Sequence, residues 1–159
     1  NAGFVVQALF FASAALVVGR ALARRGPAYA ALLGAALADA LGLVLLALFH
    51  SGAREIADGT FVWHMLGATL SILGGNLVAI SSGFALAPLG MLRFYRPAGI
   101  TLGLFGIGGI LFLVTGPGWF PAGAVERASV YTITVWELMT ATLLLSQRGG
   151  KLSAAKGRA

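Results

Sequence analysis

The stretch FVWHMLGATLSILGGNLVAISSGFALA, from Phe61 to Ala87, decides the fold class of this chain. It has 27 residues, and His64 is the only titratable residue among them. Because an α-helix rises about 1.5 Å per residue, this stretch would reach roughly 40 Å and exceed the ~30 Å hydrocarbon core of a bilayer. It therefore predicts a membrane-spanning helix in the middle of a helical bundle.

The composition of the whole chain agrees with this stretch. Of its 159 residues, 58% are hydrophobic and 10% are charged, whereas soluble domains carry about 25% charged residues. The mean hydropathy is +0.91. These values indicate an integral membrane protein rather than a soluble domain. The chain has no cysteine, which excludes disulfides and thiolate metal sites.

Four further apolar stretches accompany the central one, and short loops separate them. Pro27, Pro88 and Pro97 mark helix boundaries, because proline ends one helix and can begin the next. The predicted fold is all-α, with one transmembrane helical bundle at residues 1–147 and a basic, mobile tail at residues 148–159. The additional spans are Phe4–Leu22, Tyr29–Phe49, Ala98–Thr115 and Ala128–Leu145.

Lysine and arginine are distributed unequally between the two sides that five alternating spans define. Nine fall on one side and two on the other. By the positive-inside rule, the basic loops and the C-terminus are predicted to be cytoplasmic, in a bacterial plasma membrane. The net charge of +6 is then explained by the positive residues of the cytoplasmic loops and tail. We therefore expect no nucleic-acid partner. The larger group is Arg20, Arg24, Arg25, Arg93, Arg96, Arg148, Lys151, Lys156 and Arg158, and the smaller is Arg54 and Arg127.

The start of the chain carries a further expectation. Asn1 is followed by neither a basic n-region nor a small-residue cleavage site, so no secretory signal peptide is predicted. Five spans with a cytoplasmic C-terminus place Asn1 outside. An odd number of spans after a start other than Met predicts one more helix before Asn1, and six in the full protein.

Small residues recur at helical spacing in three of the spans. In lipid, helices associate through close backbone approach between small residues rather than through hydrophobicity. We interpret these faces as packing surfaces and not as nucleotide-binding loops, since the glycine run at 106–109 lies inside a span. The faces are Gly99, Gly103, Gly106 and Gly109; Gly67, Ser71, Gly74 and Val78; and Ala31, Ala35, Ala38 and Gly42.

Two acidic residues, Asp39 and Glu137, fall at the centre of predicted spans. A carboxylate at that depth costs roughly 2.5–3.5 kcal/mol on insertion scales. Each must therefore face the bundle interior, stay protonated or pair with another group. A functional role and a purely structural role in helix packing are both open for them.

Polar residues on three predicted helices suggest a cavity that opens to the outer surface, with two carboxylates at its floor. Asp39 and His50 share one helix face, because eleven residues make about three turns. A second stripe, in the last span, consists of Arg127, Tyr131, Thr134 and Glu137. The candidate residues of this cavity are Asp39, His50, His64, Asn76, Glu126, Arg127 and Glu137.

Structural roles are the alternatives for most of these residues. A buried amide such as Asn76 commonly joins helices. Interfacial histidines such as His50 and His64 often only cap a helix or form a hydrogen bond. Glu126 and Arg127 could form a surface ion pair, or Glu126 could favour the helix start through the helix dipole.

Two segments, WHMLGATLSILGGNLVAI and GAVERASVYTITVWELMTATLLL, together with the opening NAGFVVQALFF, resemble a known family. It is the bacterial membrane family catalogued as domain of unknown function nine-nine-eight. The resemblance covers nearly the whole chain. It implies a six-helix fold whose first helix precedes Asn1, and it implies no established activity. The matching positions are Asn1, His64, Gly67, Gly75, Asn76, Glu126, Arg127, Tyr131 and Trp136.

Three hypotheses for function follow from these patterns. The first is a non-enzymatic accessory or lipid-binding subunit that packs against membrane partners, because the chain has neither a G-x-S-x-G nor an H-E-x-x-H motif. The second is a small proton- or cation-linked transporter that uses Asp39 and Glu137. The third is an enzyme acting on lipid head groups at the outer leaflet, which requires His64, Glu126 and Arg127 to converge. No particular cofactor is predicted.

Overall fold

In the computed structural model, the described part of the chain consists of α-helices and short connections, without any strand. The structure describes residues 2–21, 26–87, 93–116 and 121–156. Five helices are long and apolar enough to cross a membrane, which confirms the predicted all-α fold with five spans. The helices are α1 (Ala2–Ala21), α2 (Pro27–Leu48), α3 (Ala53–Ala57), α4 (Phe61–Ala85), α5 (Tyr95–Thr115) and α6 (Ala122–Lys156).

The predicted spans coincide with the long helices but differ from them at some ends. α5 begins at Tyr95 and not at Ala98. Pro97 is accommodated there because it lies in the first turn, where the backbone N–H groups have no partner within the helix. α4 ends at Ala85, two residues before the predicted end at Ala87.

α6 extends beyond its predicted span in both directions. It begins at Ala122 instead of Ala128, where the Pro121 carbonyl oxygen accepts a hydrogen bond from the Ala124 N–H at 2.9 Å. It continues to Lys156, through most of the segment that was expected to be a mobile tail. The expected division between bundle and tail at residues 147 and 148 is therefore not a helix end.

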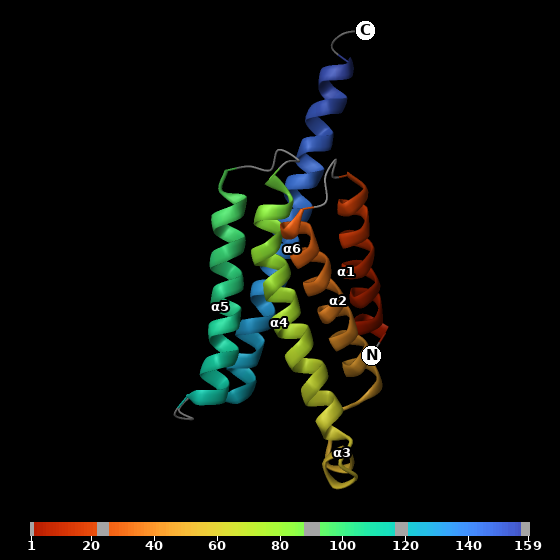
Figure 1. The fold of residues 1–159 in the computed structure, drawn as a ribbon, viewed down its shortest axis with the longest axis vertical. Coiled ribbons are helices and arrows are strands. Elements are labelled where there is room, and N and C mark those ends of the chain that lie inside the picture. The colour runs from red at the N-terminus through yellow and green to blue at the C-terminus, as the bar shows by residue number, and fades with distance from the viewer. Residues whose placement is uncertain (1, 22–25, 88–92, 117–120, 157–159) are drawn as a thin grey trace.

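The long helices run alternately in opposite directions, and α4 lies near the middle of the bundle (Figure 1). α4 packs against α2, α5 and α6, while α1 packs against α2 and α5 packs against α6. The short helix α3 lies in the connection between α2 and α4. Backbone contact between α1 and α6 is marginal, so these two helices meet mainly through side chains.

Alternation of the helices separates the described basic residues into two sets. Arg20, at the end of α1, and Arg93 and Arg96, at the start of α5, lie at the upper end of the bundle in Figure 1. Arg54 in α3 and Arg127 near the start of α6 lie at the opposite end. This is the separation that the loop charges predict. Asn1, Arg24, Arg25 and Arg158 lie outside the described residues.

Glycines bring the helix backbones into contact, as the small-residue faces predict. A Cβ atom on Gly42 of α2 would lie 2.4 Å from the backbone nitrogen of Ser71 in α4. A Cβ atom on Gly103 of α5 would lie 2.5 Å from the backbone oxygen of Asn76, also in α4. Because no real side chain tolerates such distances, α4 can approach both neighbours this closely only where glycine is present.

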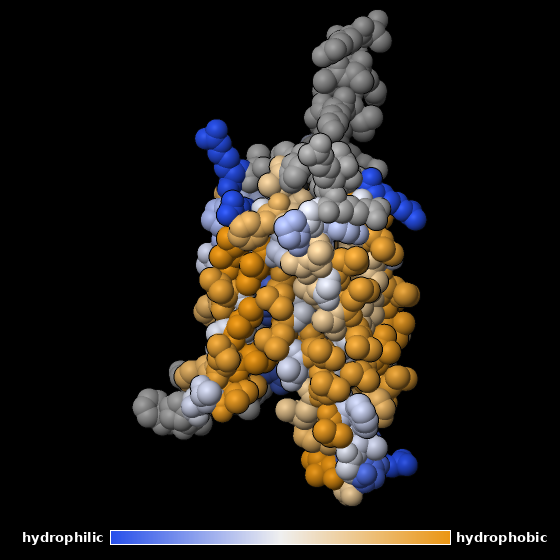
Figure 2. Space-filling model, viewed as in Figure 1, coloured by the Kyte–Doolittle hydropathy of each residue, from blue (hydrophilic) through white to orange (hydrophobic). Residues whose placement is uncertain are grey.

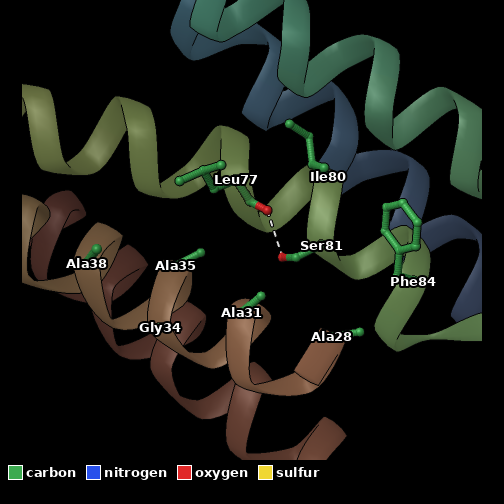
Figure 3. Close-up of a pocket in the computed structure, with 9 residues that line it drawn as sticks. All are labelled: Ala28, Ala31, Gly34, Ala35, Ala38, Leu77, Ile80, Ser81 and Phe84. Carbon is green, nitrogen blue, oxygen red and sulfur yellow. Dashed lines mark hydrogen bonds between the residues drawn. The ribbon is translucent and has the colours of Figure 1, made fainter. Parts of the chain in front are cut away.

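The small-residue face of α2 is only partly used for packing. Ala35 and Gly42 are buried, whereas Ala31 and Ala38 also border an open groove of about 570 Å³ between α2 and α4 (Figure 3). The groove is almost wholly apolar, and the hydroxyl of Ser81 donates to a carbonyl oxygen of its own helix at 2.7 Å. The groove therefore presents no unsatisfied polar group.

The face of the bundle seen in Figure 2 is mostly apolar between its two ends. Val114, Leu145 and Phe105 have exposed fractions of 78%, 68% and 66%. A water-soluble bundle of this size would turn such side chains inward, because their burial is favourable by about 1.5–3 kcal/mol each. Their outward position is explained if the surrounding medium is hydrocarbon, and the five apolar helices indicate a multi-pass membrane protein.

Candidate functional site

Asp39 is held in the middle of the bundle by the close contact between α2 and α4. Its exposed fraction is 1%. The Ser71 hydroxyl donates to Asp39 Oδ1 at 3.0 Å, and a Cβ atom on Gly74 would lie 2.5 Å from the Asp39 backbone nitrogen. The other carboxyl oxygen, Oδ2, has no hydrogen-bond partner among the described residues.

The second mid-span acid, Glu137, lies on the side of α6 that faces α1 and α2. It is half-buried, and the Gln7 side-chain amide of α1 lies at 3.5 Å from its Oε1, as a donor. Glu137 is also close enough to Asp39 for the two carboxyl groups to interact electrostatically. α1, α2 and α6 therefore place Gln7, Asp39 and Glu137 so that Glu137 interacts with both of the other side chains.

Glu137 lines a cavity of about 510 Å³ inside the bundle. Its walls are formed by α1, α2, α4 and α6, and they are almost entirely apolar. Leu32 and Ala36 of α2 and Val78 of α4 are buried members of this lining, with exposed fractions of 4%, 1% and 3%. A volume of this size is typical of sites that hold small organic ligands.

The opening of the cavity can be located from the exposure of its walls. The lining residues of α2 and α4 are buried, but several lining residues of α1 and α6 are exposed on the outside of the bundle. Val17 of α1 is 61% exposed and Leu145 of α6 is 68% exposed. The cavity therefore has its floor on α2 and α4 and opens sideways between α1 and α6, toward the surrounding hydrocarbon.

Three residues of the otherwise apolar lining, Ser82, Trp136 and Thr140, belong to a polar network that is internally satisfied. The Trp136 indole N–H lies 3.0 Å from Ser82 Oγ and 3.1 Å from Tyr95 Oη. The Tyr95 hydroxyl donates to Ser82 Oγ at 3.1 Å and lies 3.0 Å from Thr140 Oγ1. This network joins α4, α5 and α6. None of its members was predicted as a site residue, although the i, i+4 spacing of Trp136 and Thr140 places them on one helix face.

Asn76 is wholly buried in a separate network that joins α4 to α6. Its amide donates to the backbone oxygens of Ile72 at 2.8 Å and Ser129 at 3.1 Å, and its Oδ1 accepts from the Thr132 hydroxyl at 2.7 Å. Every polar atom of the side chain is engaged. The structure thus favours the packing role that was the alternative for this residue.

The two histidines lie at the end of the bundle where α2 passes to α4. His64 Nδ1 lies 3.0 Å from the Phe49 carbonyl oxygen, which can only accept, so Nδ1 carries the proton. The bond satisfies a carbonyl at the C-terminal end of α2, and the imidazole ring stacks on Phe61. His50 is exposed at the same end.

Of the seven predicted site residues, Glu137 alone lines the cavity. Glu126 and Arg127 are exposed near the start of α6, and Tyr131, in the stripe predicted to face inward, is 61% exposed. Among the described residues, no hydrogen bond or ion pair joins His64 to Glu126 or Arg127. The convergence that the enzyme hypothesis requires is therefore not found. The buried face of α6 consists instead of Ser129, Thr132, Ile133, Trp136 and Leu143.

Comparison with known proteins adds no assignment. Within the described ranges, no group of three or more His, Cys, Asp or Glu side chains is arranged to hold a metal ion. No protein-family model, no curated protein and no solved structure matches the chain. The resemblance to family nine-nine-eight stays a prediction.

Proposed function

We propose that this protein binds the apolar chain of a lipid-like molecule in the cavity between α1 and α6. The observation that carries the proposal is the shape of this cavity, which has a buried floor on α2 and α4 and a lateral opening. A molecule dissolved in the bilayer could enter from the side without crossing an aqueous phase. The role is that of a non-enzymatic binding or accessory subunit in the membrane.

The surroundings of the cavity support a binding role rather than a chemical one. The hydroxyls of Ser82 and Thr140 are engaged with Trp136, Tyr95 or backbone oxygens. Neither hydroxyl group is therefore free to act as a nucleophile in the cavity. We further propose, from the distribution of arginine and lysine, a bacterial plasma-membrane location with the C-terminus in the cytoplasm.

Trp136 provides a direct test, because it lines the cavity and is only 7% exposed. In a variant with Trp63→Phe and Trp119→Phe, it is the only tryptophan. Brominated acyl chains quench indole fluorescence on contact. We expect phospholipids brominated along their chains to quench Trp136 in nanodiscs, since a chain that enters the cavity reaches the indole.

A matched pair of variants separates entry into the cavity from contact with bulk lipid. Ala14→Phe places a ring in the cavity and should reduce quenching strongly. Ser13→Phe, at the adjacent exposed position outside the lining, should leave quenching unchanged. Absence of quenching in the parent protein, or equal quenching in both variants, would contradict the proposal.

A further inference from the structure

The cavity lining contains one charged residue, and that residue is acidic. Apart from Glu137, the lining is apolar except for hydroxyl groups and the Trp136 indole, which bond to one another or to backbone. Glu137 receives only a long hydrogen bond, 3.5 Å, from Gln7. The cavity therefore offers a bound molecule one strong polar partner, a carboxyl group.

Asp39 adds a second, independent indication. It does not line the cavity, but it interacts electrostatically with Glu137, its exposed fraction is 1%, and its Oδ2 has no hydrogen-bond partner among the described residues. Burial of a carboxyl oxygen without a partner is costly, and a nearby positive charge offsets part of that cost. The Ser71 hydroxyl satisfies only the other oxygen of this group.

No basic residue described in the structure is placed to neutralise the two acids. α1 presents Gln7 to them, and its only charged residue is Arg20 in the last turn. Asp39 is the only charged residue of α2, and α4 carries only His64, which is bonded to the end of α2. Arg96 of α5 lies over the ring of Phe84, and Arg127 of α6 is exposed. The two interacting carboxyl groups therefore have no positive partner among the side chains that the structure describes.

We propose that the molecule bound in the cavity is an amphiphilic ammonium compound, with its apolar chain in the cavity and its cationic group beside Glu137, whose carboxyl group also interacts electrostatically with Asp39. This inference rests on the proposed function and names the class of ligand. Two carboxyl groups that interact in a low-dielectric site must be neutralised by a proton or a cation. In an amphiphilic cation, the positive charge can neutralise the carboxyl groups while the apolar chain fills the cavity.

The same electrostatics disfavour the other common amphiphiles. A fatty acid or an anionic lipid head group would place a second negative charge beside Glu137, and like charges in a site of low dielectric repel strongly. An uncharged alcohol could enter, but it would leave the carboxyl pair without a counter-charge. The cavity should therefore rank ligands by head-group charge at constant chain length.

The test uses three bromoalkyl probes of equal chain length, which carry a trimethylammonium, a hydroxyl or a carboxylate group. Quenching of Trp136 in the single-tryptophan protein reports binding of each. The ammonium charge is permanent, so the probe itself does not titrate. We expect the ammonium probe to bind about tenfold more tightly than the alcohol, and the carboxylate to bind more weakly than both.

Variants assign the preference to the acid pair. Glu137→Gln should remove the tenfold preference and leave binding of the alcohol unchanged, which also shows that the variant is folded. Glu126→Gln, which removes an exposed acid of the same helix, should retain the preference. If Glu137→Gln does not fold, Glu137→Leu gives the same comparison.

The proposed function and the proposed ligand class can fail separately. If none of the three probes quenches Trp136, the proposed function fails together with the ligand class. If the alcohol quenches but the ammonium probe has no advantage, or keeps its advantage in Glu137→Gln, the ligand class is wrong and the proposed function stands.

Discussion

Asn76 and Asp39 are both buried polar residues of the bundle, yet their surroundings differ. The Asn76 side chain makes three interhelical or backbone hydrogen bonds, and no polar atom is left over. Asp39 has one bond and one unpartnered oxygen. At this scale, packing roles and candidate binding roles are separated by whether the hydrogen-bonding capacity of a side chain is used up.

A pH effect is expected in the exposed turn before α4. Asp58 Oδ1 accepts from the Thr60 hydroxyl at 2.6 Å and from the Thr60 N–H at 3.0 Å, and these bonds lower the pKa of the Asp58 carboxyl below its usual range. Because the pKa is lower in the folded protein, the turn is stabilised above the unfolded pKa. This stabilisation is lost as the pH falls below about 4.

Thr60→Val removes the hydroxyl donor and keeps the N–H donor. The pKa of Asp58 should therefore rise toward its usual value without reaching it, as measured by the carboxyl carbon chemical shift during an acid titration in detergent micelles. Ser51→Ala, in the same loop, should leave the titration unchanged. Identical curves for the Thr60 variant and the parent protein would show that the hydroxyl has no effect.

At the scale of helices, contact between backbones and not side-chain hydrophobicity sets which faces meet. α5 illustrates this, since its buried residues are Tyr95, Gly99, Gly103 and Gly106, while its large apolar side chains point outward. Lipid solvates an apolar side chain as well as another helix does. Small residues therefore mark the contact face.

Two glycines of α5 provide a matched test of this view. A Cβ atom on Gly103 would lie 2.5 Å from the Asn76 backbone oxygen, whereas one on Gly108 would meet nothing within 4 Å. Gly103→Ala should destabilise the bundle by about 1–3 kcal/mol through overpacking. Gly108→Ala should be neutral or slightly stabilising. Equal denaturation curves in detergent for the two variants would refute the role of Gly103.

At the scale of the whole molecule, five long helices of alternating direction connect two ends of the bundle that differ in charge. The cavity lies on one side of this bundle, between α1 and α6. The position of the cavity depends on four helices, α1, α2, α4 and α6, because α4 joins α2 to α6 while α1 contacts mainly α2. No single helix pair contains the binding space.

The orientation across the membrane can be measured because the chain has no cysteine. Gly26→Cys lies at the basic end, and Ser51→Cys and Gly123→Cys lie at the opposite end, all at exposed positions. If the basic end is cytoplasmic, a membrane-impermeant maleimide added to intact cells should label the last two. It should label Gly26→Cys only after permeabilisation. The reverse pattern would contradict the proposed orientation.

Sequence alone was enough for the number of spans, their approximate limits and the glycine faces, because these depend on bilayer thickness and on residue size at helical spacing. It also singled out Asp39 and Glu137, because a carboxylate inside an apolar span is conspicuous. It did not identify the inward face of α6. Arg127 and Tyr131 were expected there, but Ser129, Thr132 and Trp136 occupy it.

Only the tertiary structure decided which polar residues from different helices interact with one another. Asp39, Glu137 and Gln7 come from three helices, and their proximity depends on the rotation and tilt of each. Those angles are set by packing against neighbouring helices, and in lipid no apolar face of an isolated helix is preferred over another. The lateral cavity beside Glu137 likewise exists only because α1 and α6 fail to close on each other.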